Sequence, residues 1–171
     1  MKSIGYASFA GCGSLIEAEF GKDSQITEIG DIAFDNSGLT SFFIPKSLRK
    51  TGCKIFSDSN NLVSIKIDEN CELEVIEKFT FQSIKIKSMI IPKNIKMLRE
   101  WAFAFCKQLL EIQLLGDEIV LCKEVFRLCN NLFLISIPNC TQITLGNNVF
   151  YKVSKDFIAE TSASGNTKEM S

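Results

Sequence analysis

One residue type returns along this chain at nearly constant spacing. Seven phenylalanines are separated by 22 to 25 residues: Phe9, Phe34, Phe56, Phe81, Phe103, Phe126 and Phe150. A single globular core gives no reason for such spacing. A stack of similar coils does, because each coil places one large apolar residue at the same point of a shared core. The spacing therefore predicts a repeat protein of about seven coils.

The second half of each repeat has the pattern of a short strand. It starts at a leucine-like residue five or six positions after the phenylalanine. Apolar residues follow three and five positions further on, as in Leu62, Ile65 and Ile67. Period-two alternation is typical of a half-buried strand. We expect these strands to be parallel and in register, forming one ribbon whose inner row is Ile44, Ile67, Ile91, Leu114 and Ile137.

The rest of each coil is predicted to contain a bend and a second extended piece. Segments such as 76–81 and 98–103 place apolar residues five apart, which fits one helical or 3₁₀ turn, or a tight bend. All three prolines, Pro45, Pro92 and Pro138, directly follow a strand segment, where proline ends the strand and fixes φ at the corner. Residues 95–98 then read as extended. Each coil is thus expected to have two extended sides and one bent side.

The repeat pattern fades near the C-terminus. We expect residues 1–153 to form the solenoid, and residues 154–171 to form a degenerate last repeat and a disordered tail rich in Ser, Thr, Gly, Ala and Lys. Phe157 and Ile158 are candidates for the leucine-like residue of that last partial repeat.

Composition excludes several function classes. The chain has no histidine, which removes the commonest general base and zinc ligand, and its formal net charge is −1, which disfavours a nucleic-acid partner. Neither a Gly-rich phosphate loop nor a nucleophile elbow is visible. No apolar run is long enough to span a membrane, and the N-terminus lacks a signal-peptide core, which indicates either a cytosolic protein or a piece of a longer chain. We expect no enzyme activity, no cofactor and no metal.

The cysteines are expected to be structural. Seven are present, without a CxxC pair, and Cys12, Cys106 and Cys129 each stand three residues after a repeating phenylalanine. Ser37 and Ser59 occupy the same position in other repeats. A small, weakly polar residue there is expected inside a tight turn, against neighbouring backbone groups. Zinc binding by four cysteines is the disfavoured alternative, because the cysteines are spread over different coils.

Several segments carry a specific family pattern. Residues 29–34 read Ile-Gly-Asp-Ile-Ala-Phe and 39–45 read Leu-Thr-Ser-Phe-Phe-Ile-Pro, while 102–109 hold Ala-Phe-x-x-Cys-x-x-Leu. The pattern resembles the BspA-type leucine-rich repeat. The resemblance implies an α/β, β-rich solenoid: a right-handed leucine-rich-repeat superhelix of about seven 22–25-residue repeats with a parallel β-sheet ribbon. It also implies relatives in mucosal bacteria and parasitic protists, often surface proteins that bind host proteins or other cells, with no catalytic residues to carry over.

The outward positions of the strands give a candidate binding surface. The second and fourth residues after each leucine-like position face away from the core, and most are small or polar. We nominate five of them as protein-binding residues: Phe43, Lys66, Ile90, Gln113 and Leu134. An exposed apolar residue on a polar ribbon suits a protein contact. The alternative is that scattered exposed apolar residues are ordinary.

Two further features have both a functional and an ordinary interpretation. Lys85, Lys87, Lys93 and Lys96 cluster in sequence and would suit an acidic partner, or would form a solvated face. Asn139-Cys140-Thr141 is an N-glycosylation sequon, whose use depends on secretion.

The resulting functional hypothesis is a non-catalytic protein-interaction module, including cell-surface adhesion or host-protein binding. The alternative is a cytosolic scaffold or regulatory repeat protein. The family resemblance indicates the cell surface, whereas the missing signal peptide and the odd number of cysteines indicate the cytoplasm. The ligand and the oligomeric state are left open.

Overall fold

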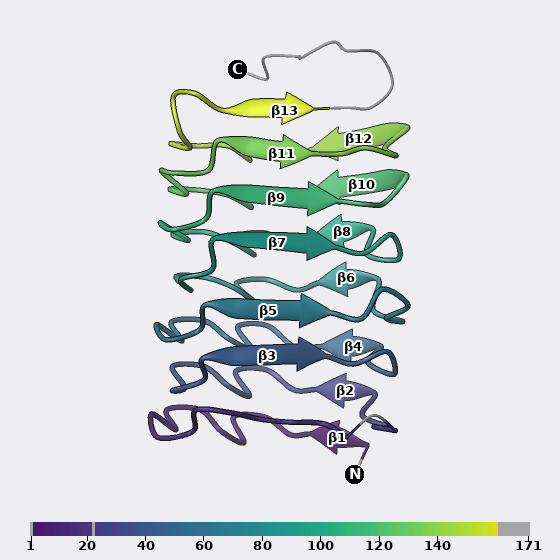
Figure 1. The fold of residues 1–171 in the computed structure, drawn as a ribbon, viewed down its shortest axis with the longest axis vertical. Coiled ribbons are helices and arrows are strands. Elements are labelled where there is room, and N and C mark those ends of the chain that lie inside the picture. The colour runs from purple at the N-terminus through teal and green to yellow at the C-terminus, as the bar shows by residue number, and fades with distance from the viewer. Residues whose placement is uncertain (1, 22, 161–171) are drawn as a thin grey trace.

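The chain forms a parallel β-solenoid of about seven turns in a computed structural model that describes residues 2–21 and 23–160 (Figure 1). Thirteen short strands are described, and these residues contain no helix. The two extended sides predicted for each coil are present as two ribbons of strands. The bent side is made of turns, so the tight bend is the alternative that forms.

The two ribbons lie on opposite sides of the core. The front ribbon consists of β3 (Ser41–Ile44), β5 (Ser64–Ile67), β7 (Ser88–Ile91), β9 (Glu111–Leu114), β11 (Leu134–Ser136) and β13 (Ile158–Glu160). The back ribbon consists of β1 (Ser3–Ile4), β2 (Glu28–Ile29), β4 (Lys50–Thr51), β6 (Val75–Ile76), β8 (Met97–Leu98), β10 (Glu118–Leu121) and β12 (Gln142–Leu145). All described pairings are parallel and in register, for example Phe42 with Ile65 and Met89 with Ile112.

The strand alternation faces the core as the sequence predicts. Ile44, Ile91, Leu114 and Ile137 of the expected inner row are buried, while Ile67 is only half-buried. The repeating phenylalanines form a continuous stack inside the solenoid, with ring centroids 5.0 to 6.0 Å apart. The five central rings are fully buried, whereas Phe9 and Phe150 in the outer coils are more exposed.

The bent side has a backbone conformation that repeats with the phenylalanines. The residues two positions before and two positions after each of the six phenylalanines from Phe34 onward have positive φ: Ile32, Asn36, Lys54, Asp58, Phe79, Ser83, Trp101, Phe105, Glu124, Leu128, Asn148 and Lys152. This backbone conformation points alternate N–H groups of the bent side toward the next coil. Phe103 N–H, for instance, donates to Val125 O over 3.0 Å, and Phe105 N–H to Arg127 O over 2.8 Å.

The position three residues after the phenylalanine also joins coils. Its side chain donates to the phenylalanine carbonyl of the preceding coil: Ser59 to Phe34 (2.8 Å), Cys106 to Phe81 (2.9 Å) and Cys129 to Phe103 (3.0 Å). This confirms the structural role predicted for Cys106 and Cys129. Cys12, in the first coil, is exposed. Ile84 takes this position in the fourth coil and has no donor to offer.

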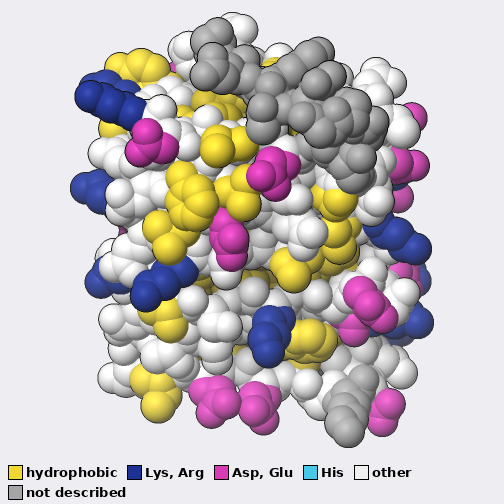
Figure 2. All heavy atoms as spheres, turned by 45° about the horizontal axis from the view of Figure 1, so that its top comes forward, with side chains coloured by type: hydrophobic (Ala, Val, Ile, Leu, Met, Phe, Trp, Pro, Cys, Tyr) yellow, Lys and Arg dark blue, Asp and Glu magenta, His cyan; other side chains and the backbone are white. Residues whose placement is uncertain are grey.

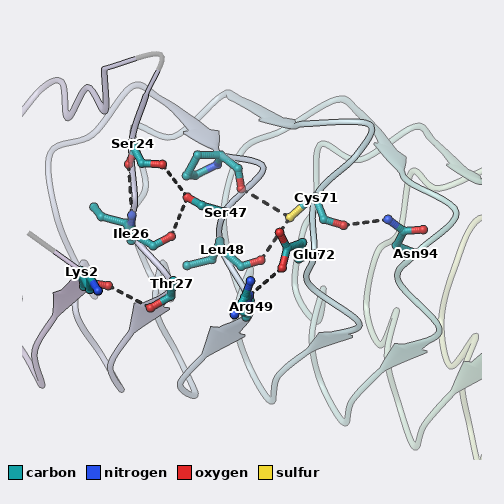
Figure 3. A network of polar contacts seen from close by, with 11 residues as sticks. Lys2, Ser24, Ile26, Thr27, Ser47, Leu48, Arg49, Cys71, Glu72 and Asn94 are labelled. Carbon is teal, nitrogen blue, oxygen red and sulfur yellow. Dashed lines mark hydrogen bonds and ion pairs between the residues drawn. The ribbon is translucent and has the colours of Figure 1, made fainter.

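A second polar ladder runs along the corner between the front and back ribbons (Figure 3). Ser47 Oγ lies 2.9 Å from Ser24 O and 2.8 Å from Ile26 O, within hydrogen-bond distance of both carbonyls. One coil further on, the Cys71 thiol lies 3.6 Å from the carbonyls of Pro45 and Leu48. The Asn94 amide then donates to Cys71 O over 2.9 Å. Each coil is therefore fastened to the previous one at its corner as well as on its bent side.

The coil stack continues past residue 153. Strand β13 pairs with β11, and the Phe157 ring lies 4.8 Å from that of Phe150. Part of the segment predicted to be a degenerate repeat and tail therefore extends the front ribbon and the aromatic stack. Residues 161–171 of that segment lie outside the described residues.

Candidate binding surface

The front ribbon is interrupted in its middle, contrary to the single ribbon expected from the sequence. β3 pairs with β5 over four residues, and β7, β9, β11 and β13 form a separate sheet. No bridge between β5 and β7 is found in the described structure. The back ribbon is interrupted at the same level, between β4 and β6. In Figure 1 the strands on either side of this level are visibly further apart than their neighbours.

Pro92 explains part of the front interruption. The residues that follow β5 and β9 donate backbone N–H groups across the ribbon: Asp68 to Ile44 O and Leu115 to Ile91 O, each over 3.0 Å. Pro92 follows β7 and has no N–H. It therefore cannot give the Ile67 carbonyl the bond that Ile44 and Ile91 receive.

The other two prolines stand at junctions with shorter pairing or none. β9 and β11 pair only up to Ser136, two residues before Pro138. β3 precedes Pro45, and no strand on its other side is found in the described residues. The two strands followed by Asp68 and Leu115 pair with the preceding strand over four residues, one more than β11. Among the junctions between two described strands of the front ribbon, all pairing is lost only at the one that precedes Pro92.

A longer corner accompanies the interruption of the back ribbon. Ile67 and Ile76 are nine positions apart, whereas Ile44 and Thr51, and likewise Ile91 and Leu98, are seven apart. The corner itself stays bonded across this level, because Glu72 N–H donates to Lys46 O over 3.0 Å. The bent side also stays bonded, since Phe56 N–H donates to Thr80 O over 3.1 Å. Among the described residues, only the strands are unpaired at this level, β5 from β7 on the front ribbon and β4 from β6 on the back ribbon.

The opening on the front face is a groove of about 1350 Å³, which we call the front window. The apolar part of its lining includes Phe43, Val63, Ile67, Met89 and Ile90. Phe43, Val63 and Ile90 are 45%, 56% and 57% exposed. Ile67 is half-buried here, whereas its counterparts in the neighbouring coils are buried, so the window reaches toward the core.

The rim of the front window carries an excess of positive charge. Four exposed lysines line it, Lys66, Lys85, Lys87 and Lys93, together with Asp68 and Glu69. Within the described part of the chain, none of these four lysines forms an ion pair. Figure 2 shows apolar side chains at the surface interrupted by basic and acidic ones. Apolar walls with unpaired cations suit a ligand that is both apolar and acidic.

The structure brings together some of the nominated residues. Phe43, Lys66 and Ile90 line the front window. Gln113 and Leu134 lie on β9 and β11 of the same ribbon, but they are half-buried and do not contribute to the lining. Of the lysine cluster, Lys85, Lys87 and Lys93 line the window, whereas Lys96 directly precedes β8 of the back ribbon. Sequence reasoning missed Val63 and the window itself, for which Pro92 and the longer spacing after Ile67 were the available signals.

The cysteines offer no activated thiol at this surface. Burial is the main reason that the pKa of Cys106 lies well above its ordinary value of 9.0, with a contribution from the neighbouring Cys129 thiol. Burial likewise raises the pKa of Cys71 and of Cys53. Thiolates are therefore disfavoured at these positions at neutral pH.

No grouping of three or more potential metal-ligating side chains occurs among residues 2–21 and 23–160. The same residues include no helix long and apolar enough to cross a membrane.

The fold and the regularly repeated apolar positions define the class of this protein as a leucine-rich-repeat β-solenoid. The family profile described as the BspA type leucine rich repeat region, with six copies, matches residues 1–110 and 27–158. The chain therefore belongs to the BspA-type leucine-rich repeat family. A comparison with curated proteins finds no match.

Three solved structures of bacterial proteins are similar to this chain. The pneumococcal vaccine antigen PcpA is 17% identical, with a TM-score of 0.56, over 95% of this chain and 66% of that one. A leucine-rich repeat protein from Bacteroides ovatus is 17% identical, with a TM-score of 0.43, over 89% and 56%. A leucine rich cell surface protein from Faecalibacterium prausnitzii is 18% identical, with a TM-score of 0.48, over 84% and 47%. The chain spans about half the length of the latter two proteins.

Proposed function

We propose that this protein is a non-catalytic protein-interaction module that binds a protein partner through its front ribbon. The observation that carries the proposal is the front window, where Phe43 and Ile90 stand exposed beside Lys66. Its volume exceeds the range of about 300–1,000 Å³ that is usual for small-molecule sites. A segment of a macromolecule therefore fits this opening better than a metabolite.

The setting that the family suggests is adhesion to another cell or to a host protein. BspA-type repeats are arrays of similar coils, and the profile of this family matches residues 1–110 and 27–158 of the chain. Binding by such arrays depends on the variable outward residues, because the repeated residues are buried in the core. Specificity in this chain is accordingly assigned to the front window.

A protein array probed with the intact chain tests this function. The matched variants are Phe43→Ser with Ile90→Ser on the window, and Tyr6→Ser at an exposed apolar position on the first coil. We expect one or more array proteins to be bound by the wild type and by Tyr6→Ser, and to be lost with the double variant. An array without binders, or binders equally retained by both variants, would refute the proposal.

A second setting is favoured by one observation. All seven cysteines are free, as expected of a protein kept in a reducing compartment. In that case the same surface would serve a cytosolic scaffold. Cell fractionation with thiol titration separates the two settings, since a protein recovered at the cell surface excludes the scaffold.

A further inference from the structure

We propose that the front window takes a single apolar side chain from an acidic segment of the partner, with the carboxylates on either side of it held by the rim lysines. This inference rests on the proposed function and specifies the chemistry of the ligand. It combines four observations: the missing pairing of β5 with β7, the half-buried Ile67, the exposed apolar walls and the unpaired lysines.

The gap between β5 and β7 has the length of one anchored residue with its neighbours. Strands β5 and β7 have four residues each, and four residues of extended chain span about 13 Å. The coils stay joined at both ends of this opening, by Lys85 N–H to Leu62 O (3.0 Å) and by the Asn94 amide to Cys71 O (2.9 Å). The opening is therefore bounded at both ends, and its length matches about four residues of extended chain.

The walls and rim define which side chains fit. An aliphatic or aromatic side chain that enters between Phe43 and Ile90 reaches Ile67 and Met89, and so removes apolar surface from water on both partners. The same segment can place backbone N–H groups near the Ile67 carbonyl, which Pro92 cannot serve. Lys66, Lys87 and Lys93 then favour acidic residues immediately before and after the anchor.

Charge complementarity favours a protein segment over another polyanion. A sulfated glycan or a nucleic acid would meet the lysines, but it would leave the apolar walls without a partner. An acidic peptide with one large apolar residue satisfies both the walls and the rim. The two ligand classes differ in a measurable way, because only the peptide depends on its apolar residue.

Synthetic peptides test this chemistry on the intact protein. The probe is a fluorescein-labelled pentapeptide with leucine between two pairs of glutamates. One control replaces the leucine by alanine, another replaces the glutamates by lysines, and heparin serves as the comparison polyanion. We expect fluorescence anisotropy to show binding of the probe about tenfold or more tighter than that of the alanine control, since roughly 1.4 kcal/mol corresponds to tenfold. The lysine control should not bind.

Protein variants locate the binding. Lys66→Glu with Lys87→Glu should abolish probe binding, while Lys96→Glu with Lys107→Glu, at exposed lysines outside the window lining, should leave it within about twofold. Pro92→Ala restores the missing N–H and should weaken binding several-fold. Pro138→Ala, which restores an N–H at a different junction, should not.

Each contrary result overturns the inference. Equal binding of the leucine and alanine peptides would show a charged surface without an anchor. Tighter binding of heparin than of the probe would show a polyanion site, and no binding of any probe would remove the acidic-segment ligand. None of these results bears on the array experiment. If array partners are still lost with Phe43→Ser and Ile90→Ser, the front ribbon remains a protein-binding face while this inference fails.

Discussion

The Cys106 thiol donates a hydrogen bond of 2.9 Å to the carbonyl of Phe81, one coil before it. Cys129 and Ser59 make the same contact in their own coils, which shows that a thiol and a hydroxyl are interchangeable at this position. Cys106→Ser should therefore cost less than about 1 kcal/mol. Cys106→Ala leaves the carbonyl without this donor and opens a small void, which should cost about 1–2 kcal/mol. Urea denaturation of the three proteins checks the order, and an alanine variant as stable as the serine variant would contradict it.

Alkaline pH should destabilise the protein through the same thiol. The pKa of Cys106 is raised in the folded state, mainly by burial, above its ordinary value of 9.0. The unfolded chain therefore releases this proton at a lower pH than the folded one. The resulting stabilisation is complete below the unfolded pKa and is lost as pH rises through the folded pKa.

Denaturation at about pH 8 and about pH 10 measures this loss. Cys106→Ser removes the titrating group and should lose less stability between the two conditions than the wild type. Cys12→Ser, at an exposed cysteine, should behave like the wild type. An equal alkaline loss in the wild type and in Cys106→Ser would assign the effect to other groups.

The buried phenylalanines of the repeat and the outward residues of the strands should differ sharply in their contribution to stability. Phe103 is fully buried, with its ring between those of Phe81 and Phe126 at 5.0 and 5.6 Å. Phe103→Ala should cost about 3–5 kcal/mol. Phe43 is 45% exposed, and Phe43→Ala should cost about 1 kcal/mol or less. Thermal or chemical denaturation measures both values, and equal losses would contradict the register of β3.

The positive-φ positions of the bent side offer a route to higher stability. Ser83 has φ of 62°, a conformation that glycine adopts without a Cβ clash, and no side-chain hydrogen bond of Ser83 is found in the described structure. Ser83→Gly should therefore stabilise the protein by about 0.5–1 kcal/mol. The matched control Ser41→Gly, in strand β3, should lose about that amount because glycine weakens a strand. A melting-temperature comparison suffices, and a loss in both variants would argue against strain at Ser83.

Most of the fold was predictable from the sequence because each coil places the same types of side chain at the same positions of the core. The phenylalanine spacing, the strand alternation and the position of Cys106 all recur, so each repeat supports the interpretation of the others. The bent side was less predictable. Residues such as Ile32 and Trp101 have no intrinsic preference for positive φ, and the inter-coil hydrogen bonds impose it.

The front window was not predicted because it arises where the repeat pattern becomes irregular. Phe43, Lys66 and Ile90 could be nominated from the outward alternation alone. That they share an opening depends on two irregularities, Pro92 and the longer corner after Ile67, whose combined effect is a tertiary one. Gln113 and Leu134 lie on strands that stay fully or nearly fully paired, so their surface is closed.

The same junction leaves a buried hydroxyl without a partner on the back ribbon. Thr51 of β4 is 5% exposed, and its Oγ1 makes no hydrogen bond within the described structure. Its counterparts Ile29 and Ile76 are apolar. Thr51→Val keeps the shape and removes the unsatisfied group, so it should stabilise the protein by about 1 kcal/mol. Thr80 is the matched control, because it is also buried but its Oγ1 donates to Glu77 O over 2.8 Å. Thr80→Val should instead cost about 1 kcal/mol in the same denaturation experiment. If Thr51→Val is destabilising to the same extent as Thr80→Val, the Thr51 hydroxyl has a partner in solution.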